Sequence, residues 1–312
     1  MILLTLTLTI SRASATTITV GTYPGGMAFD SHLNEVFVTN YGGGSGSTVS
    51  VISDTTNTVV ATITVGTGPA AAAFDSHKRE VFVTNYISDS VSVISDATNK
   101  VIKTIKVGAS PWWIAFDSNK DEVFVTNTAA NLPGTVSVIS DATNKVIKTI
   151  KVGTHPIGIA FDSKKDELFV ANFESNSISV ISDATNKVIK TITSASLVNV
   201  EGVGFDSHLN EVFVASFSTS GTVFVISDAT NTVVATVTVG SGSRWVAFDS
   251  HLNEVFVTNE GSDSVSVISD ATNMVTTTIT VSSAWGLAFD SHLNEIFVSS
   301  YTSPGTVSLL PG

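Results

Sequence analysis

Residues 74–108 read FDSHKREVFVTNYISDSVSVISDATNKVIKTIKVG, and this stretch decides the fold. Three of its segments, residues 80–85, 90–95 and 100–106, alternate apolar with polar side chains and are rich in Val, Ile, Thr and Phe. Such alternation is typical of strands, and the Asn, Asp, Ser and Gly residues between the segments are typical of turns. Together with a short strand that ends at the Phe-Asp pair, the stretch predicts four antiparallel strands in succession.

The same pattern recurs along the whole chain. The Phe-Asp pair returns at intervals of 41 to 45 residues, and its seven Phe residues are Phe29, Phe74, Phe116, Phe161, Phe205, Phe248 and Phe289. A four-stranded unit of this length, repeated, is the signature of a β-propeller blade, and no segment has a helical period. The sequence therefore predicts an all-β protein: a seven-bladed β-propeller with four antiparallel strands in each blade.

The two ends of the repeat array complement each other. The last repeat stops after its third strand at residues 307–310, while residues 15–21 (ATTITVG) match the fourth-strand sequence of residues 61–66 (ATITVG). We expect the N-terminal strand to complete the last blade and close the ring, which removes most exposed sheet edges. Residues 16–312 are then a single propeller domain. Residues 1–15 are expected to be a signal-like leader or, alternatively, a retained strand that pairs with a neighbouring molecule.

Composition excludes several classes of protein. The chain of 312 residues has 15 Lys and Arg against 27 Asp and Glu, a net charge of −12, and no cysteine. An acidic protein is not expected to bind nucleic acid, and the lack of cysteine excludes disulfides, thiolate zinc sites and thiol catalysis. No apolar run is long enough to span a membrane. We find no phosphate-binding loop, nucleophile elbow or metal-binding motif, so no cofactor and no metal is expected.

Residues 36–40 (VFVTN) and 81–85 (VFVTN), followed in each repeat by VSVIS-type and TIxVG-type segments, resemble the Tyr-Val-Thr-Asn repeat family of β-propellers. These propellers are common in archaeal and bacterial surface-layer and secreted proteins. The resemblance implies the propeller fold and a secreted or cell-surface location. This chain has Phe where the motif has Tyr, and its fifth and seventh repeats lose the Thr-Asn pair.

The repeat separates structural residues from variable ones. Five of the six histidines follow the Asp-Ser pair of the first turn, and we interpret them as solvated turn residues: His32, His77, His208, His251 and His292. The repeated Asp residues are expected to cap turns through backbone hydrogen bonds. Because antiparallel strands alternate in direction, these turns share one acidic face. The loops that vary from repeat to repeat share the other face.

The variable face carries all four tryptophans at the start of the first strand of a repeat. Equivalent positions in other repeats hold Gly or Ala, so packing does not demand large side chains there. Aromatic groups with one Arg and one His around a channel are typical of binding sites. We predict these ligand-binding residues: Trp112, Trp113, Trp245, Trp285, Arg244, His155 and Tyr23. Strand alternation predicts that one of the two Trp positions faces the channel and that the other packs between blades or faces solvent.

Two functions remain open. The first is a non-enzymatic extracellular binding or scaffold module that uses its variable face, with a cell-surface component, a polymer or a second copy of itself as partner. Self-association through the N-terminal strand is one form of it. The alternative is a propeller hydrolase or lyase, similar to lactonases or streptogramin lyases, with its site at the channel mouth. Its weak catalytic candidates are His155, Glu201 and Arg244.

Overall fold

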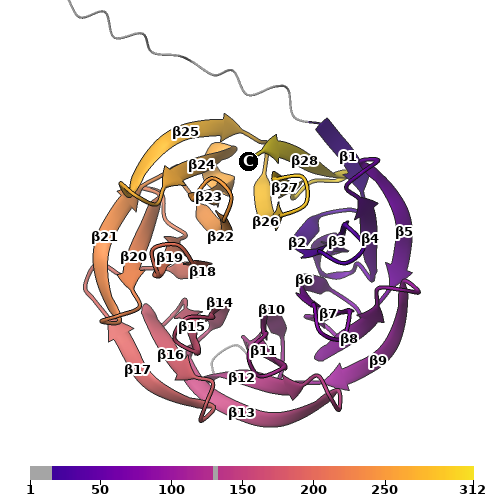
Figure 1. Cartoon of the computed structure of the whole chain (residues 1–312), viewed down its shortest axis with the longest axis horizontal. Helices are drawn as coiled ribbons and strands as arrows, with labels where there is room; N and C mark the ends of the chain where they lie inside the picture. Colours follow the sequence, from indigo (N-terminus) through magenta and orange to yellow (C-terminus); the bar gives the residue numbers. More distant parts are fainter. Residues whose placement is uncertain (1–15, 129–132) are drawn as a thin grey trace, which may run out of the picture.

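A computed structural model describes residues 16–128 and 133–312, and the first fifteen residues, with the signal-like or strand hypothesis, lie outside them. The described chain forms seven four-stranded antiparallel sheets arranged as blades around a central channel (Figure 1). This confirms the seven-bladed propeller. Each blade runs from an inner strand at the channel through a second and third strand to an outer strand on the wall.

The strands of blades 1 to 4 are nearly uniform in length. They are β2 (Pro24–Asp30), β3 (Glu35–Asn40), β4 (Thr48–Ser53) and β5 (Thr58–Thr64); β6 (Pro69–Asp75), β7 (Glu80–Asn85), β8 (Ser90–Ser95) and β9 (Lys100–Lys106); β10 (Pro111–Asp117), β11 (Glu122–Asn127), β12 (Pro133–Ser140) and β13 (Lys145–Thr154); β14 (Pro156–Asp162), β15 (Glu167–Asn172), β16 (Ser177–Ser182) and β17 (Lys187–Thr193). A short 3-10 helix, η1 (Gly42–Gly44), follows β3.

Blades 5 to 7 repeat the arrangement, and the last blade takes its outer strand from the start of the chain. The strands are β18 (Val200–Asp206), β19 (Glu211–Ser216), β20 (Thr222–Ser227) and β21 (Thr232–Thr238); β22 (Ser243–Asp249), β23 (Glu254–Asn259), β24 (Ser264–Ser269) and β25 (Met274–Thr280); β26 (Ala284–Asp290), β27 (Glu295–Ser300), β28 (Gly305–Pro311) and β1 (Thr16–Val20). The second 3-10 helix, η2 (Glu260–Ser262), follows β23.

The N-terminal strand β1 closes the ring, as expected. It pairs antiparallel with β28, with Thr16 opposite Leu309 and Val20 opposite Gly305. Ile18 of β1 is buried with Val307 and Leu309 in a cluster that also reaches into blade 1. The two ends of the described chain therefore share one blade.

Packing between blades supplies the core. The Phe residues of the seven second strands have no exposed surface: Phe37, Phe82, Phe124, Phe169, Phe213, Phe256 and Phe297. One cluster illustrates the arrangement, since Phe37 and Val51 of blade 1 pack with Val81 and Ile94 of blade 2. The second and third strands are buried on both faces, as β3 and β4 illustrate, whereas outer strands such as β5 keep exposed residues.

The Thr-Asn pair of the repeat is structural. The Thr39 hydroxyl donates to the carbonyl oxygens of Gly26 in its own blade and Ala70 in the next, at 2.9 and 3.1 Å. The Asn40 amide donates to the hydroxyls of Thr48 and Ser50, both at 3.0 Å. In blade 7 Ser299 takes the place of the Thr residue and keeps the bond to the neighbouring blade, at 2.8 Å.

The acidic face, formed by the inner-to-second and third-to-outer turns, keeps its turn histidines exposed to solvent, as predicted, and it also carries contacts between blades. Asp30 caps its turn as expected, accepting the His32 and Leu33 amides at 2.8 and 3.2 Å. However, His32 Nδ1 lies 3.0 Å from Asp96 of the next blade, and Asp96 is buried. The pairs His208–Asp270 and His292–Asp54, at 2.7 and 2.8 Å, repeat this contact. These turn histidines therefore link neighbouring blades.

Candidate functional site

The variable face holds a pocket of about 380 Å³ at the mouth of the channel. We call this pocket the mouth. Residues of most blades line it, from the starts of inner strands and the loops after second strands: Tyr41, Tyr86, Trp112, Thr128, His155, Ile157, Phe173, Glu201, Phe217, Arg244 and Trp285. The inner strands place side chains there because each has a register shift at its start, as between Pro111 and Ile114. Such bulges re-aim side chains near functional sites.

Two tryptophans stack across the channel. The rings of Trp113 in blade 3 and Trp245 in blade 6 lie 3.4 Å apart at the centroids and 7° from parallel. Trp245 is only 2% exposed. A Cβ atom on Gly26 would lie 2.9 Å from the Trp113 ring, so glycine at this position leaves room for the stack. The stacked pair spans the channel and belongs to the same hydrophobic cluster as Trp285 and Ile157.

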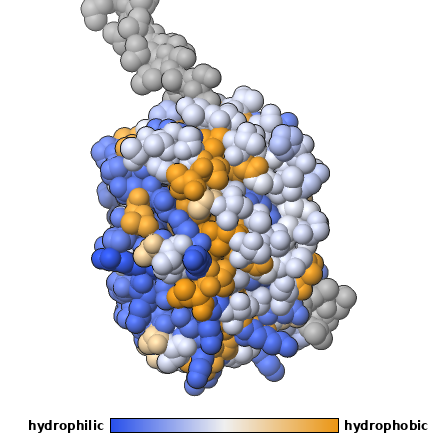
Figure 2. Space-filling model, turned by 90° about the vertical axis from the view of Figure 1, so that its right-hand side faces the viewer, coloured by the Kyte–Doolittle hydropathy of each residue, from blue (hydrophilic) through white to orange (hydrophobic). Residues whose placement is uncertain are grey.

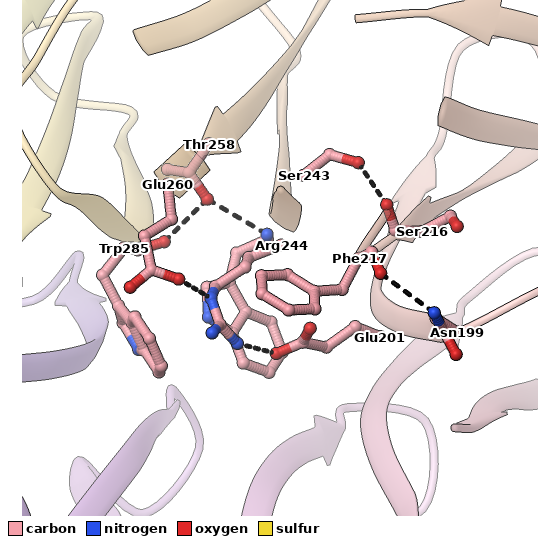
Figure 3. Close-up of polar contacts among 10 residues, drawn as sticks. Asn199, Glu201, Ser216, Phe217, Ser243, Arg244, Thr258, Glu260 and Trp285 are labelled. Carbon is pink, nitrogen blue, oxygen red and sulfur yellow. Dashed lines mark hydrogen bonds and ion pairs between the residues drawn. The ribbon is translucent and has the colours of Figure 1, made fainter. Parts of the chain in front are cut away.

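The charged centre of the mouth is Arg244 with two carboxylates (Figure 3). Arg244 Nη1 donates to Glu201 Oε1, and Arg244 Nε donates to Glu260 Oε2 at 2.6 Å. The guanidinium also lies between two rings, 4.2 Å from the centroid of Phe217 and 4.1 Å from that of Trp285. Two carboxylates and two aromatic faces therefore hold the guanidinium in one orientation.

Glu201 is the buried member of this group. Its residue exposure is 2%, whereas the side chain of Glu260 is 29% exposed. The pKa of Glu201 is raised to about 7, chiefly by burial and to a smaller extent by the Glu260 carboxylate, while Arg244 acts in the opposite direction. A carboxyl group that titrates near neutral pH exchanges protons readily under physiological conditions, as a general acid or base must.

Aromatic hydroxyl groups form the opposite side of the mouth. Tyr86 and Tyr41 meet the Trp112 ring edge-on, with centroids 5.1 and 5.8 Å away. Trp285 stacks on Tyr301 at 4.5 Å. Burial raises the pKa values of Tyr41 and Tyr301, so both phenols stay protonated at neutral pH. They can donate hydrogen bonds to a ligand.

His155 lies on the charged side of the mouth. Its Nδ1 atom is 3.3 Å from Glu174 Oε1, and its ring centroid is 5.9 Å from that of Phe173. The His155 backbone has a positive φ of 55°. The corresponding residue of blade 1 is Tyr23, which has a φ of 48°, is 37% exposed and lies 5.1 Å from the Tyr301 ring.

The structure thus gathers the sequence-predicted residues at one place. Trp112, Trp285, Arg244, His155 and Glu201 line the mouth itself, Trp113 and Trp245 form the stack, and Tyr23 lies at its edge. The expectation that only one Trp position faces the channel is wrong, because the bulge at the start of each inner strand interrupts strict alternation.

The mouth is also lined by residues outside the predicted set of site residues, namely Tyr41, Tyr86, Thr128, Ile157, Phe173 and Phe217, and Glu260 contacts Arg244 beside them. Glu260 and Phe217 hold Arg244, and Thr128 adds a hydroxyl to the lining. Glu260, Phe217 and Thr128 share one signal, since each is the first residue after a second strand of its blade. A further groove of about 860 Å³ adjoins the mouth, and its lining includes Phe173, Phe217 and Glu260. A ligand larger than the mouth can extend into this groove.

The one group of three or more metal-ligand side chains found among residues 16–128 and 133–312 is on the acidic face. It consists of Asp30, His32 and Asp96, which already bond to one another and to the backbone. No helix in the described part of the chain is long and apolar enough to cross a membrane.

The fold and the site together define a seven-bladed propeller whose channel mouth holds a buried carboxyl–guanidinium pair. Residues 95–302, more than half of the chain, match the family described as lactonase, 7-bladed beta-propeller. The chain belongs to this family. The non-enzymatic scaffold reading is therefore wrong, and the family match favours the lactonase-like alternative.

Other comparisons add only the fold. A solved structure of hydrazine synthase from Kuenenia stuttgartiensis superposes with a TM-score of 0.83 at 16% sequence identity, covering 94% of this chain and 97% of that one. At that identity the likeness concerns the propeller alone. No curated protein matches the sequence significantly.

Proposed function

We propose that this protein is a hydrolase that opens a cyclic ester at the mouth, with Glu201 as general base and Arg244 as the electrostatic group. The observation that carries the proposal is the buried Glu201 carboxyl, with a pKa of about 7, bonded to Arg244 on the wall of a 380 Å³ pocket. Membership of the lactonase family supports the reaction class.

The step needs only water as co-reactant. Ionised Glu201 removes a proton from a water molecule as the water oxygen bonds to the ester carbonyl carbon, and negative charge moves onto the carbonyl oxygen. The ring C–O bond then breaks, and the proton held by Glu201 passes to the leaving alkoxide, which gives a hydroxy acid. General base catalysis of this kind contributes about 10²- to 10⁴-fold in rate.

Arg244 is suited to stabilise the oxyanion. Within the described residues its Nη1 and Nε atoms bond to Glu201 and Glu260, whereas a guanidinium has five N–H groups in all. The remaining N–H groups, chiefly those of Nη2, are available to a developing oxyanion. Because the flanking rings and carboxylates already hold the group, it needs no reorganisation during the reaction.

The aromatic side of the mouth would bind the body of the substrate. Trp112 and Trp285 offer apolar surface, and the protonated Tyr41 hydroxyl offers a donor. His155, paired with Glu174, is a second group on the lining that can exchange a proton with the leaving alcohol. We further propose that the protein works outside the cell or at its surface, a location that the resemblance of its repeats to surface-layer propellers favours.

The test is hydrolysis of cyclic esters, measured as acid release at constant pH with δ-gluconolactone and dihydrocoumarin as polar and aromatic probes. We expect Glu201→Gln to lower kcat about 100-fold or more, because the general base is lost. Glu260→Gln, which removes the exposed carboxylate on the other edge of Arg244, is the matched control and should lose much less. For the wild type, kcat/KM should rise with pH through about 7 as Glu201 ionises. Wild-type rates equal to buffer for both probes, or an unaffected Glu201→Gln variant, would refute the proposal.

A further inference from the structure

Most basic residues of this acidic protein lie in one part of the ring. Residues 67–193, which form blades 2 to 4, hold 13 of the 15 Lys and Arg residues and 13 of the 27 Asp and Glu residues. The remainder of the chain holds two basic and 14 acidic residues. The net charge of −12 therefore comes entirely from the sequence outside residues 67–193, while blades 2 to 4 are balanced overall.

Within blades 2 to 4, eight lysines lie on the outer strands β9, β13 and β17 without any acidic residue beside them on those strands. All eight are exposed: Lys100, Lys103, Lys106, Lys145, Lys148, Lys151, Lys187 and Lys190. We call this surface the lysine wall. The outer strands of the other four blades carry no charged residue at all.

The fold does not require these lysines. The outer strand β5 of blade 1 reads TVVATIT where β9 reads KVIKTIK, and both make the same ladder with the same bulge. The strand therefore forms equally well when the positions of Lys100, Lys103 and Lys106 hold the blade 1 residues Thr58, Ala61 and Thr64. Lysines that are structurally replaceable, adjacent in three blades and free of acidic neighbours on their strands form a basic docking surface.

We propose that the lysine wall binds a linear acidic polysaccharide through its carboxylates. Lysines three residues apart on one strand are about 10 Å apart, whereas phosphates follow each other at about 3.4 Å along a nucleic-acid strand, so the wall fits a polymer with sparse charge. The wall carries no Arg for bidentate phosphate contacts and no aromatic ring on which a base can stack.

Hydroxyl and amide groups accompany the lysines. Thr104 and Thr149 lie between lysines on β9 and β13, and Thr191 follows Lys190 on β17. At the border with blade 5, a groove of about 300 Å³ is lined by Lys190, Thr191 and Asn231 among others. Lys190 Nζ donates to the Thr230 carbonyl oxygen at 2.9 Å, which places its charge beside this groove. Sugar hydroxyls suit such a lining.

The outer strands of blades 1 and 2 allow a comparison of the same surface without and with lysines. Figure 2 shows this side of the molecule, with a band of apolar residues between hydrophilic residues on one flank and residues of mostly intermediate hydropathy on the other. Val60 and Ile102, the third residues of their strands, are 51% and 53% exposed. Blade 1 has an exposed apolar residue at this position but no lysines on its outer strand. A comparison of blades 1 and 2 therefore separates the effect of the lysine charges from that of the apolar residue.

The experiment measures binding of the full chain to immobilised hyaluronate, which has one carboxylate per disaccharide, at low and at physiological salt. A wall variant takes the blade 1 residues at four positions: Lys100→Thr, Lys103→Ala, Lys145→Thr and Lys148→Ala. A matched control removes four positive charges from turns of the acidic face. At each position it takes the residue found in the equivalent turn of blade 1: Lys78→Leu, Arg79→Asn, Lys164→His and Lys165→Leu. Both variants have the same formal net charge.

We expect the wild type to bind hyaluronate with an affinity that falls as salt rises, the wall variant to lose about tenfold or more, and the control to stay within about twofold. Equal losses in the two variants would show a net-charge effect and overturn the proposal. So would binding to polyphosphate without binding to hyaluronate. A salt-sensitive dimer that the wall variant abolishes, with no hyaluronate binding, would assign the wall to a second copy and also overturn it.

Discussion

Glu201 makes a stability prediction that does not depend on the substrate. The substitution Glu201→Gln removes a carboxyl whose pKa rises from 4.5 in the unfolded chain to about 7 in the folded one. At about 1.4 kcal/mol per pKa unit, the folded state disfavours the ionised form by about 3 kcal/mol. Between pH 4.5 and 7 the folded protein binds more protons at this site than the unfolded chain, so stability is lost as pH rises across that range.

The assay is urea unfolding of wild type and Glu201→Gln at a series of pH values from 4.5 to 8. Other titrating groups are common to both proteins and cancel in the difference. The wild type should lose about 3 kcal/mol relative to the variant over this range, most of it below pH 7. Glu260→Gln, at a carboxylate with 29% exposure, is the control and should show a far smaller change. A wild-type-minus-Gln difference that does not vary with pH would refute the burial argument for Glu201.

Three further predictions concern the ring. Trp245→Ala should lower the free energy of unfolding by about 3–5 kcal/mol, because it removes a buried side chain and its stack on Trp113; an unchanged urea midpoint would contradict the stack. Deletion of residues 1–21 should lower stability by several kcal/mol, since the ladder and packing of β1 are lost; an unaltered melting temperature would rule out the closure. Asp183→Asn should lower the pKa of Asp117 from about 6 in an NMR titration, because burial raises that pKa most and the Asp183 charge adds to it; an unmoved pKa would refute the pairing.

The fold could be predicted from the sequence because the same pattern of strands and turns recurs seven times. Three patterns together indicate a seven-bladed propeller: the period-two alternation, the recurring Phe-Asp pair and the match between residues 15–21 and 61–66. Each can be read directly from the order of residues in the sequence. Repetition likewise identified the residues that vary, so Trp112, Arg244 and Glu201 could be placed on one face before their contacts were known.

Contacts across the ring could not be predicted in this way. The Trp113–Trp245 stack joins residues whose strands never pair, and the bulges that aim them into the channel have no marker in the sequence. The Arg244 contact to Glu201 joins two different blades. For the same reason the sequence gives no sign that the exposed turn residue His32 contacts Asp96, which belongs to the next blade.

The lysine wall shows a different loss of information. Its eight residues are plain in the sequence, but the net charge averages them with acids on other blades. Only the ring arrangement shows that β9, β13 and β17 are consecutive on the wall and share one side of the molecule (Figure 1). The basic surface is found only when charges are counted for each blade and each strand, because the net charge of the whole chain is negative.

Ring closure by β1 has a consequence for how the protein reaches its native state. Thr16 pairs with Leu309, so the seventh sheet unites strands from the two extremes of the described chain. During synthesis the first six blades can pair from neighbouring sequence as they emerge, but β1 must wait until β28 has been made. Its edge and that of the unfinished ring stay exposed meanwhile, and contacts of such sequence separation form slowly. The last blade is therefore the kinetic bottleneck of assembly and the point at which strand exchange between two nascent chains would begin.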